Sequence, residues 1–275
     1  MRLHRIVPLM LLLAACATSK QAIRPEVARV RLALAQRLAD RGEWAAALEA
    51  AEAACQAAPG DPGALILRGT ILRERGLLDE AQTDLLEAVQ HAPDSAPAHS
   101  SLAIVYERQH RPADAEKEHR RALELAPNEA HYMNNLGYAL LLHGKAREAV
   151  PVLVMAVRAG PTNVRARNNL GFAYAVSGDF PRAAQQFEFA GSPAEAKCNL
   201  GVAYERTGNI AQALAHYREA LRLDPELRRA RENLDRVVAR SAQVPPARAP
   251  SQSPESTPQE LAGRLGPAPV TGGLK

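Results

Sequence analysis

The sequence predicts an all-α protein, a solenoid of six helix-turn-helix units closed by a C-terminal helix. Three observations carry this prediction. Small and helix-terminating residues recur with a period of 34 residues, which is typical of solenoid repeats. Glycine and proline divide each period into two helix-length segments. Of the 275 residues, 54 are Ala and only 4% are aromatic, which favours closely packed helices over a β-sandwich or a conventional enzyme core.

The period appears at three independent positions. Proline recurs at intervals of 34 residues, and two alanine positions keep the same register. Small side chains at both positions let paired helices approach closely, so we expect these alanines to be buried. The recurring residues are Pro59, Pro93, Pro127 and Pro161; Ala47, Ala81, Ala115 and Ala149; and Ala54, Ala88, Ala122 and Ala156.

Each unit reads as a first helix, a glycine turn, a second helix and a terminating proline. The turn glycines suit a helix end, where a residue that tolerates positive φ is favoured, and proline cannot continue a helix interior. Leucines on the first helices should fill the space between paired helices. The glycines are Gly42, Gly76, Gly144 and Gly178, and the leucines are Leu34, Leu102, Leu136 and Leu170.

The predicted units cover residues 28–227. The fifth is four residues shorter than the period, which should change how it stacks on the sixth, and Pro151 predicts a local kink in a second helix. The unit boundaries are 28–61, 62–95, 96–129, 130–163, 164–193 and 194–227.

The ends of the chain have different compositions. Residues 226–240 place Leu227, Ala230, Leu234 and Val237 on one helical face, as a capping helix requires. Residues 241–275 hold seven prolines, four glycines and few large apolar side chains, which predicts a disordered Pro-rich tail. Residues 1–15 combine two arginines with an apolar run too short to span a bilayer, which predicts a signal peptide.

The junction after that segment resembles a bacterial lipobox, because Leu13-Ala14-Ala15 directly precede Cys16. The resemblance implies cleavage before Cys16, acylation of its thiol (palmitate among the acyl groups) and a lipid-anchored linker over residues 16–27. The residue after Cys16 is Ala17 and not Asp, which then favours export of the lipoprotein to the outer membrane, with the protein facing the periplasm. The alternative is an ordinary signal peptide, with Cys16 incidental.

The repeats resemble the tetratricopeptide repeat (TPR) family. The Leu-Gly pair of that family is matched by Leu136-Gly137, Leu170-Gly171 and Leu200-Gly201. The aromatic residue that follows this pair is matched by Tyr106, Tyr174 and Tyr204. The aromatic residue of the second helix is matched by Phe187 and Tyr217. Three positions depart from the pattern: Ala35 replaces the glycine, and Ala51 and His119 replace the second-helix aromatic. The resemblance implies a right-handed superhelix whose concave face is lined by first helices.

No motif indicates an enzyme or a cofactor. The sequence lacks the phosphate-loop, dinucleotide, zinc-protease and nucleophile-elbow patterns, so we expect a non-enzymatic protein without cofactors. The formal charge of +4 is spread along the chain, which argues against nucleic-acid binding. No metal is expected, because the clustered histidines lack i, i+4 pairs and neighbouring ligands: His91, His99, His110, His119, His131 and His143.

The candidate binding residues are asparagines on successive first helices. Asn135, Asn169 and Asn199 occupy one repeat position, directly before each Leu-Gly pair. An amide side chain donates and accepts, so a row of Asn can hold the backbone of an extended peptide; the alternative is that these Asn are structural. Flanking candidates are Asn134, Asn168, Tyr138, Phe172 and Arg165, whereas the first three units carry Ala33, Leu67 and Ser101 at the Asn position.

The whole chain resembles TPR lipoproteins of tight-adherence (Flp) and type IV pilus assembly systems. The resemblance lies in residues 168–187 (NNLGFAYAVSGDFPRAAQQF) and 190–209 (AGSPAEAKCNLGVAYERTGN). It implies a scaffold that binds a protein partner through the TPR groove and assists assembly of a pilus or secretion machine in the outer membrane. The alternative is a TPR regulator that docks on a cell-wall enzyme or, like a pilotin, on a secretin.

Overall fold

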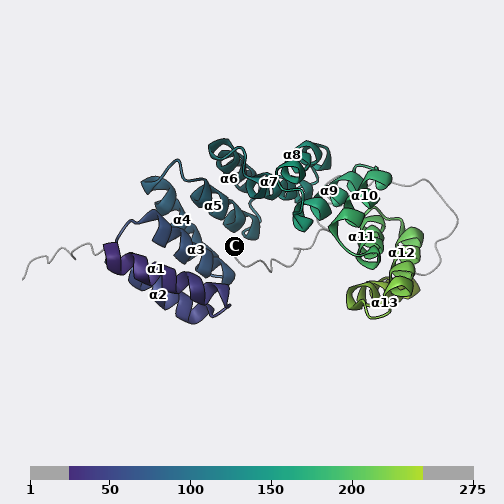
Figure 1. Ribbon diagram of the computed structural model, residues 1–275, viewed down its shortest axis with the longest axis horizontal. Coiled ribbons are helices and arrows are strands. Elements are labelled where there is room, and N and C mark those ends of the chain that lie inside the picture. The colour runs from purple at the N-terminus through teal and green to yellow at the C-terminus, as the bar shows by residue number, and fades with distance from the viewer. Residues whose placement is uncertain (1–24, 244–275) are drawn as a thin grey trace, which may run out of the picture. The chain divides into compact units, whose positions relative to one another are not determined.

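The computed structural model describes residues 25–243, and every regular element in that range is an α-helix (Figure 1). Six helix pairs and a terminal helix confirm the predicted all-α repeat fold. The predicted signal peptide, Cys16, most of the linker and nearly all of the tail lie outside the described residues. The helices are α1 Pro25–Asp40, α2 Trp44–Ala57, α3 Pro62–Glu74, α4 Leu78–His91, α5 Ala96–Arg108, α6 Pro112–Leu125, α7 Ala130–Leu142, α8 Ala146–Ala159, α9 Val164–Val176, α10 Phe180–Ala190, α11 Pro193–Arg206, α12 Ile210–Leu223 and α13 Arg228–Gln243.

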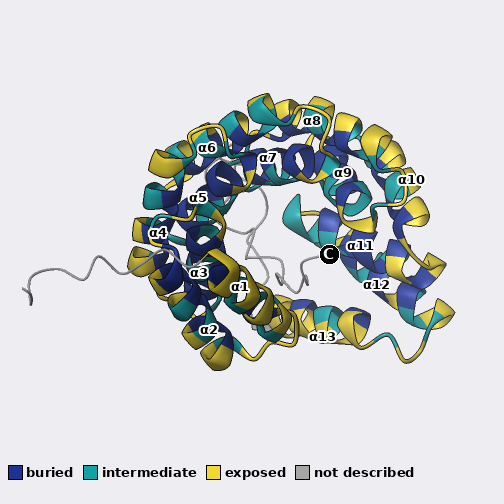
Figure 2. Cartoon of the chain, turned by 60° about the vertical axis from the view of Figure 1, so that its left-hand side comes forward, coloured by how far each residue is buried: buried dark blue, intermediate teal, exposed yellow. Residues whose placement is uncertain are grey.

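The helices divide into two compact units, with the boundary between His91 and Ala92. The N-terminal unit contains α1 to α4 and the C-terminal unit α5 to α13. Within each unit, the two helices of a repeat pack on each other, and the second helix packs on the first helix of the next repeat. In the C-terminal unit the first helices α5, α7, α9 and α11 also contact one another in succession. Figure 2 shows them on the inner side of that unit, with α6, α8 and α10 outside.

The two recurring alanine positions lie between the paired helices. All eight alanines of the predicted register are 0% exposed, so their predicted burial is confirmed. The turn glycines Gly42, Gly76, Gly144 and Gly178 have φ between 74° and 90°, as the predicted turn requires. In the third repeat His110 occupies this turn with φ 58°, a conformation that costs a non-glycine residue about 1 kcal/mol or more.

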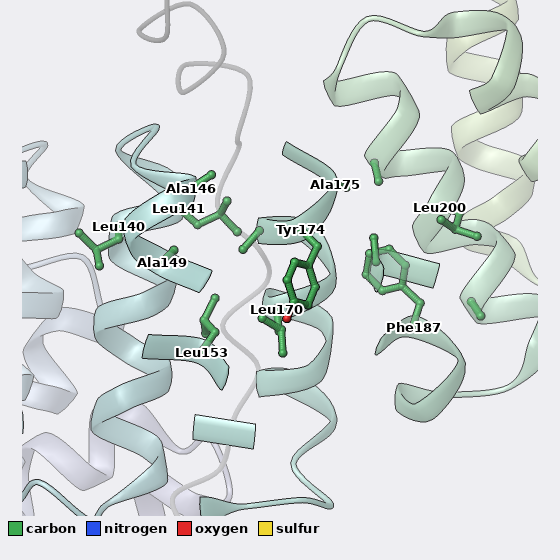
Figure 3. Close-up of a cluster of buried hydrophobic side chains, with 14 of the residues drawn as sticks. Leu140, Leu141, Ala146, Ala149, Leu153, Leu170, Tyr174, Ala175, Phe187 and Leu200 are labelled. Carbon is green, nitrogen blue, oxygen red and sulfur yellow. The ribbon is translucent and has the colours of Figure 1, made fainter. Parts of the chain in front are cut away.

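The largest buried cluster of the C-terminal unit joins α7 to α11 (Figure 3). Its packing explains the Leu-Gly pair. A Cβ atom on Gly171 would lie 2.5 Å from Cε1 of Phe187, and one on Gly201 would lie 2.5 Å from Cε1 of Tyr217. Both rings are 0% exposed. In the fifth and sixth repeats the first helix therefore needs glycine at this position because the aromatic side chain of the second helix occupies the space. In the second and fourth repeats Leu85 and Leu153 occupy the same space against Gly69 and Gly137.

The structure corrects the prediction for Leu34. This side chain is 50% exposed, whereas Leu102, Leu136 and Leu170 are buried as predicted. The physical reason is that α1 is the first described helix, so no earlier repeat in residues 25–243 covers its face. In the second repeat the same position holds Arg68, whose guanidinium pairs with the Asp84 carboxylate at 2.6 Å.

Two predicted boundaries are also wrong by a few residues. The first described helix already includes Pro25 to Val27, which the prediction assigned to the linker 16–27. The capping helix runs over Arg228–Gln243 instead of residues 226–240, so the predicted tail begins with three helical residues. The Ser241 hydroxyl donates to the Val237 carbonyl at 2.7 Å, which keeps this last turn hydrogen-bonded. Helix α8 continues through Pro151.

The fifth repeat is shortened within its second helix, since α10 has 11 residues and α8 has 14. A capping box then begins α11: the Ser192 hydroxyl accepts from the Glu195 backbone N–H, and the Glu195 carboxylate accepts from the Ser192 N–H. Aromatic rings stack across this join, with the Phe180 and Tyr204 centroids 4.0 Å apart at an interplanar angle of 5°. The shortened repeat thus still forms an ordered contact with the sixth.

One carboxylate on α11 bonds to both the sixth repeat and the capping helix, which also packs on that repeat through the buried Ala230 and Val237. Glu205 on α11 accepts hydrogen bonds from Tyr217 on α12 and from Arg236 and Arg240 on α13. Burial alone would raise the pKa of Glu205, but the bonds from Arg236 and Tyr217 and the two arginine charges lower it below its ordinary value of 4.5. The carboxylate is therefore stabilised in its charged form in the folded protein.

Acidification is expected to weaken the attachment of α13. Because the folded pKa of Glu205 is below the unfolded value, its contribution to stability is complete above about pH 4.5 and is lost as the pH falls through the folded pKa. We expect Glu205→Gln to speed amide hydrogen exchange in α13 at pH 7, with the difference from the unmodified chain shrinking below pH 4.5. The control is Glu219→Gln, which changes an exposed pair with Arg222. A pH-independent difference at α13 would contradict the assignment.

Candidate functional site

The candidate residues lie on one face of three neighbouring first helices, which we call the first-helix face. Apart from the adjacent pairs Asn134-Asn135 and Asn168-Asn169, its members are spaced by three, four or seven residues along each helix, so they share a side. All are half-buried or buried except Arg165, which is exposed. The first-helix face comprises Asn134, Asn135 and Tyr138 on α7; Arg165, Asn168, Asn169 and Phe172 on α9; and Asn199 and Arg206 on α11.

The asparagines form a ladder of hydrogen bonds between repeats. The Asn169 amide nitrogen donates to the Asn134 Oδ1 at 2.9 Å, and the Asn199 nitrogen donates to the Asn168 Oδ1 at 2.9 Å. One repeat earlier, the Asn135 nitrogen donates to the Ser100 hydroxyl at 3.3 Å. The ladder therefore has a structural role, since each amide that directly precedes a Leu-Gly pair is bonded to the preceding repeat.

The same ladder leaves polar atoms for a ligand. No described residue hydrogen-bonds to the Oδ1 of Asn135 or Asn169, or to the Nδ2 of Asn134 or Asn168. Each adjacent Asn pair thus has one acceptor and one donor without a described partner, and of the four residues only Asn134 is buried, at 5% exposed. The sequence analysis treated a structural and a binding role as alternatives, and this geometry allows both in one amide.

Asn199 differs from the other two asparagines at its repeat position. Its Oδ1 accepts from the Arg229 guanidinium at 2.9 Å, its Nδ2 donates to Asn168, and the residue is 6% exposed. The ladder therefore ends at Asn199, where the capping helix takes the place of a further repeat.

An aromatic and basic cluster lies beside the ladder. The Arg206 guanidinium sits 4.8 Å from the centroid of the Phe172 ring, which packs edge-on against Phe187 at 4.9 Å and 62°. Burial lowers the pKa of Arg206 below its ordinary value, and Tyr138, Tyr217 and Glu205 partly oppose that shift. Tyr138 and Phe172, predicted as flanking residues, thus lie beside a cation that the sequence analysis missed. Arg206 follows Asn199 by seven residues, and this helical spacing was the available signal.

Other chemistry is not assembled in the described part of the chain. Within residues 25–243, no three His, Cys, Asp or Glu side chains are placed to share a metal ion. Cys55 and Cys198 are buried and free, and burial raises the pKa of the Cys55 thiol to about 11. None of the helices between Pro25 and Gln243 has the length and apolarity needed to cross a membrane.

Successive helix pairs, glycine-aromatic contacts and a ladder between first helices define a solenoid repeat protein of the interaction class. Tetratricopeptide repeat families match residues 28–71, 66–130, 100–163, 134–190 and 194–227, together more than half of the chain. The chain belongs to the tetratricopeptide repeat family.

One curated relative and several solved structures are similar to the chain. The type IV pilus assembly protein PilF of Pseudomonas aeruginosa is 32% identical over 151 residues, which is 55% of this chain and 49% of that protein. The chain thus matches about half the length of this relative.

Solved structures share the fold at lower identity. PilW, described as a widely conserved type IV pilus biogenesis factor, is 20% identical with a TM-score of 0.66, and the match covers 78% of this chain and all of PilW. The structure of Pseudomonas aeruginosa PilF is 15% identical with a TM-score of 0.61, and the match covers 77% of this chain and 98% of the PilF chain. YrrB, described as a TPR protein with an unusual peptide-binding site, is 23% identical with a TM-score of 0.53, and the match covers 67% of this chain and 97% of the YrrB chain.

Proposed function

We propose that this chain is a non-enzymatic scaffold whose first-helix face binds an extended segment of a protein partner. We further propose that it assists assembly of a pilus or secretion machine. In this proposal Cys16 carries the lipid anchor, and the protein faces the periplasm from the outer membrane.

The Asn ladder is the observation that carries the binding proposal. An extended peptide exposes alternating backbone N–H and C=O groups, and the pairs Asn134-Asn135 and Asn168-Asn169 each leave one donor and one acceptor unused by the protein. Amides bind backbone groups without reading side chains, so such a surface suits a partner recognised by its extended conformation. Tyr138, Phe172 and Arg165 lie beside the ladder and supply side-chain preference.

The pilus assignment is supported by the relatives. PilF is by name a pilus assembly protein, and its sequence resembles 55% of this chain. PilW is by title a pilus biogenesis factor, and its fold resembles 78% of this chain. Proteins of this repeat family act mainly by holding other proteins together, which agrees with the absence of catalytic motifs from the sequence.

Replacing Asn135 and Asn169 by Ala is expected to weaken partner binding. One hydrogen bond contributes about 0.5–1.5 kcal/mol, so each single variant should bind a few-fold more weakly and the double variant roughly tenfold or more. The measurement is recovery of partners from detergent-solubilised envelopes, with folding checked by circular dichroism. Asn199→Ala is the matched control, because both polar atoms of Asn199 are already bonded within the protein. It should lower the melting temperature and leave the affinity of the folded protein unchanged.

The recovered proteins also separate the two candidate functions. Secretin or pilin components support the scaffold of a pilus or secretion machine, and cell-wall synthases support the regulator. Equal recovery by the unmodified chain and by a folded Asn135 and Asn169 double variant would exclude the ladder as the binding surface. The triple variant, which adds Asn199→Ala, should bind no more weakly than the double variant once its lower stability is taken into account.

Cys16→Ser is expected to abolish the lipid anchor. Stable anchoring needs more than one acyl chain, and in this proposal Cys16 carries all of them. Metabolic palmitate labelling of the chain should therefore disappear, and the protein should leave the membrane fraction. Ala17→Ser, at the neighbouring position, is the control variant and should keep the palmitate label. Labelling that persists in Cys16→Ser would overturn the lipoprotein proposal.

A further inference from the structure

Helix α1 exposes three large apolar side chains, which we call the α1 stripe. Val27 is 38% exposed, Val30 71% and Leu34 50%, and their spacing of three and four residues places them on one side of the helix. Among the helices of residues 25–243, α1 alone exposes more than one large apolar side chain. Single exposed apolar residues are ordinary on a protein surface, whereas several on one side of a helix indicate a surface that something else covers.

The helix at the other end of the described repeats shows the contrast. The last helix of a solenoid needs a polar outer side, because no further repeat covers it. On α13 the exposed side chains are mainly charged, and Val238, at 45%, is the one large apolar side chain among them. Helix α1 is also terminal among the described helices, yet it lacks this polar cover along the α1 stripe.

Basic residues accompany the α1 stripe. Arg37 is exposed and follows Leu34 by three residues, so it continues the stripe along the helix. Arg41, also exposed, lies in the turn directly after α1, 3.9 Å from the Glu43 carboxylate. Residues 17–43 hold six basic and three acidic residues. Apolar side chains beside arginines suit a bilayer with anionic lipids, because the apolar groups enter the acyl boundary while the long arginine side chains reach the phosphates.

The proposed lipid anchor keeps α1 close to the bilayer. Eight residues, 17–24, separate Cys16 from Pro25, and a chain of that length spans about 30 Å at most. Of the described helices, α1 is therefore the one nearest to the anchor along the chain. A tether this short raises the effective concentration of the lipid surface at α1, so a stripe of three apolar side chains is enough to hold the contact.

We propose that the α1 stripe lies on the bilayer surface beside the acylated Cys16, with Arg37 directed to anionic phospholipid headgroups. This inference rests on the lipid anchor of the proposed function, and it adds a second membrane contact, made by the folded repeats themselves. The contact fixes how the N-terminal unit is oriented on the bilayer, whereas a tether alone leaves that unit free to rotate.

The test uses the full acylated chain in vesicles of phosphatidylethanolamine and phosphatidylglycerol. Val30→Cys carries a nitrobenzoxadiazole fluorophore, whose emission shifts to the blue in apolar surroundings and which doxyl-labelled phospholipid quenches on contact. The matched control is the same fluorophore on Val238→Cys, at the exposed apolar position of α13. Cys55 and Cys198 are buried, so the unmodified chain should take up little label.

We expect doxyl-labelled lipid to quench the fluorophore at Val30 several-fold more strongly than the fluorophore at Val238. Adding Leu34→Asp should remove most of the quenching at Val30, because a carboxylate disfavours the apolar part of the bilayer, whereas Leu34→Met should keep it. Arg37→Gln should lower the quenching in vesicles that contain phosphatidylglycerol and leave it unchanged in vesicles of phosphatidylcholine alone. Leu34 and Arg37 are exposed, so these variants should remain folded.

The outcomes separate this inference from the proposed function. If the fluorophore at Val30 stays unquenched while the chain remains on the vesicles, the α1 contact is overturned and the lipid anchor stands. A blue shift at Val30 without lipid quenching would mean that protein covers the stripe, either a second copy or residues 17–24, and it would also overturn the contact. If the chain carries no acyl group and stays off the vesicles, the anchor at Cys16 fails together with the contact.

Discussion

Ala156→Glu is expected to unfold the fourth and fifth repeats while leaving the N-terminal unit folded. Ala156 on α8 is 0% exposed and lies in a cluster with Met133 on α7 and Ala166 on α9. A carboxylate placed there has no partner, and an unpaired buried charge typically costs about 3–5 kcal/mol. Repeats contact mainly their neighbours, so the damage should remain local.

Amide hydrogen exchange, followed helix by helix, measures this result. We expect exchange to speed by two orders of magnitude or more in α7 to α9, roughly what 3 kcal/mol implies, and to stay unchanged in α1 to α4. Met155→Glu is the matched control, because Met155 is the adjacent residue of α8 and is 44% exposed. Unchanged exchange in α8 of the Ala156 variant would show that the buried position is assigned wrongly.

Phe187→Ala is expected to be one of the most damaging truncations of a single side chain. Phe187 is 0% exposed and belongs to the cluster that joins α7 to α11 (Figure 3). Removing a buried phenylalanine typically costs about 3–5 kcal/mol, because the surrounding helices do not close the cavity. Phe172 and Arg206 would also lose the ring that orients them, so this variant should disturb the first-helix face together with the core.

The matched control for this truncation lies two residues away. Phe189 is 62% exposed and makes a cation–π contact with Arg167, a contact that contributes about 0.5–1 kcal/mol at an exposed site. Urea denaturation of both variants, followed by circular dichroism, should show a far larger loss of the free energy of unfolding for Phe187→Ala.

A further variant, Gly171→Ala, adds a methyl group against the Phe187 ring and should itself destabilise the protein by about 1–3 kcal/mol.

Phe187 and Gly171 should be energetically coupled. The methyl group of Gly171→Ala would fill space that Phe187→Ala empties, so the double variant should be less destabilised than the sum of the two single variants. Strict additivity would show that the glycine is required for another reason. The first repeat already contains the small pair at these positions, Ala35 and Ala51, both 0% exposed.

Much of the fold was predictable because each repeat uses the same local physics. A glycine at a helix end, such as Gly144, tolerates positive φ whatever its neighbours are, and alanines such as Ala149 allow close helix approach wherever they recur. A period of 34 residues then determines which positions are buried without any knowledge of the neighbouring repeats. For this reason the six helix pairs and their core alanines followed from the sequence.

The sequence by itself determined which residues share a helix face, and only the tertiary structure decided what each one contacts. The hydrogen bond between Asn169 and Asn134 and the stacking of Arg206 on Phe172 join residues about one repeat apart. Such contacts depend on how adjacent repeats are placed, which a pattern within one repeat does not encode. Leu34 follows the same rule, since its exposure depends on the absence of a covering repeat among the described residues.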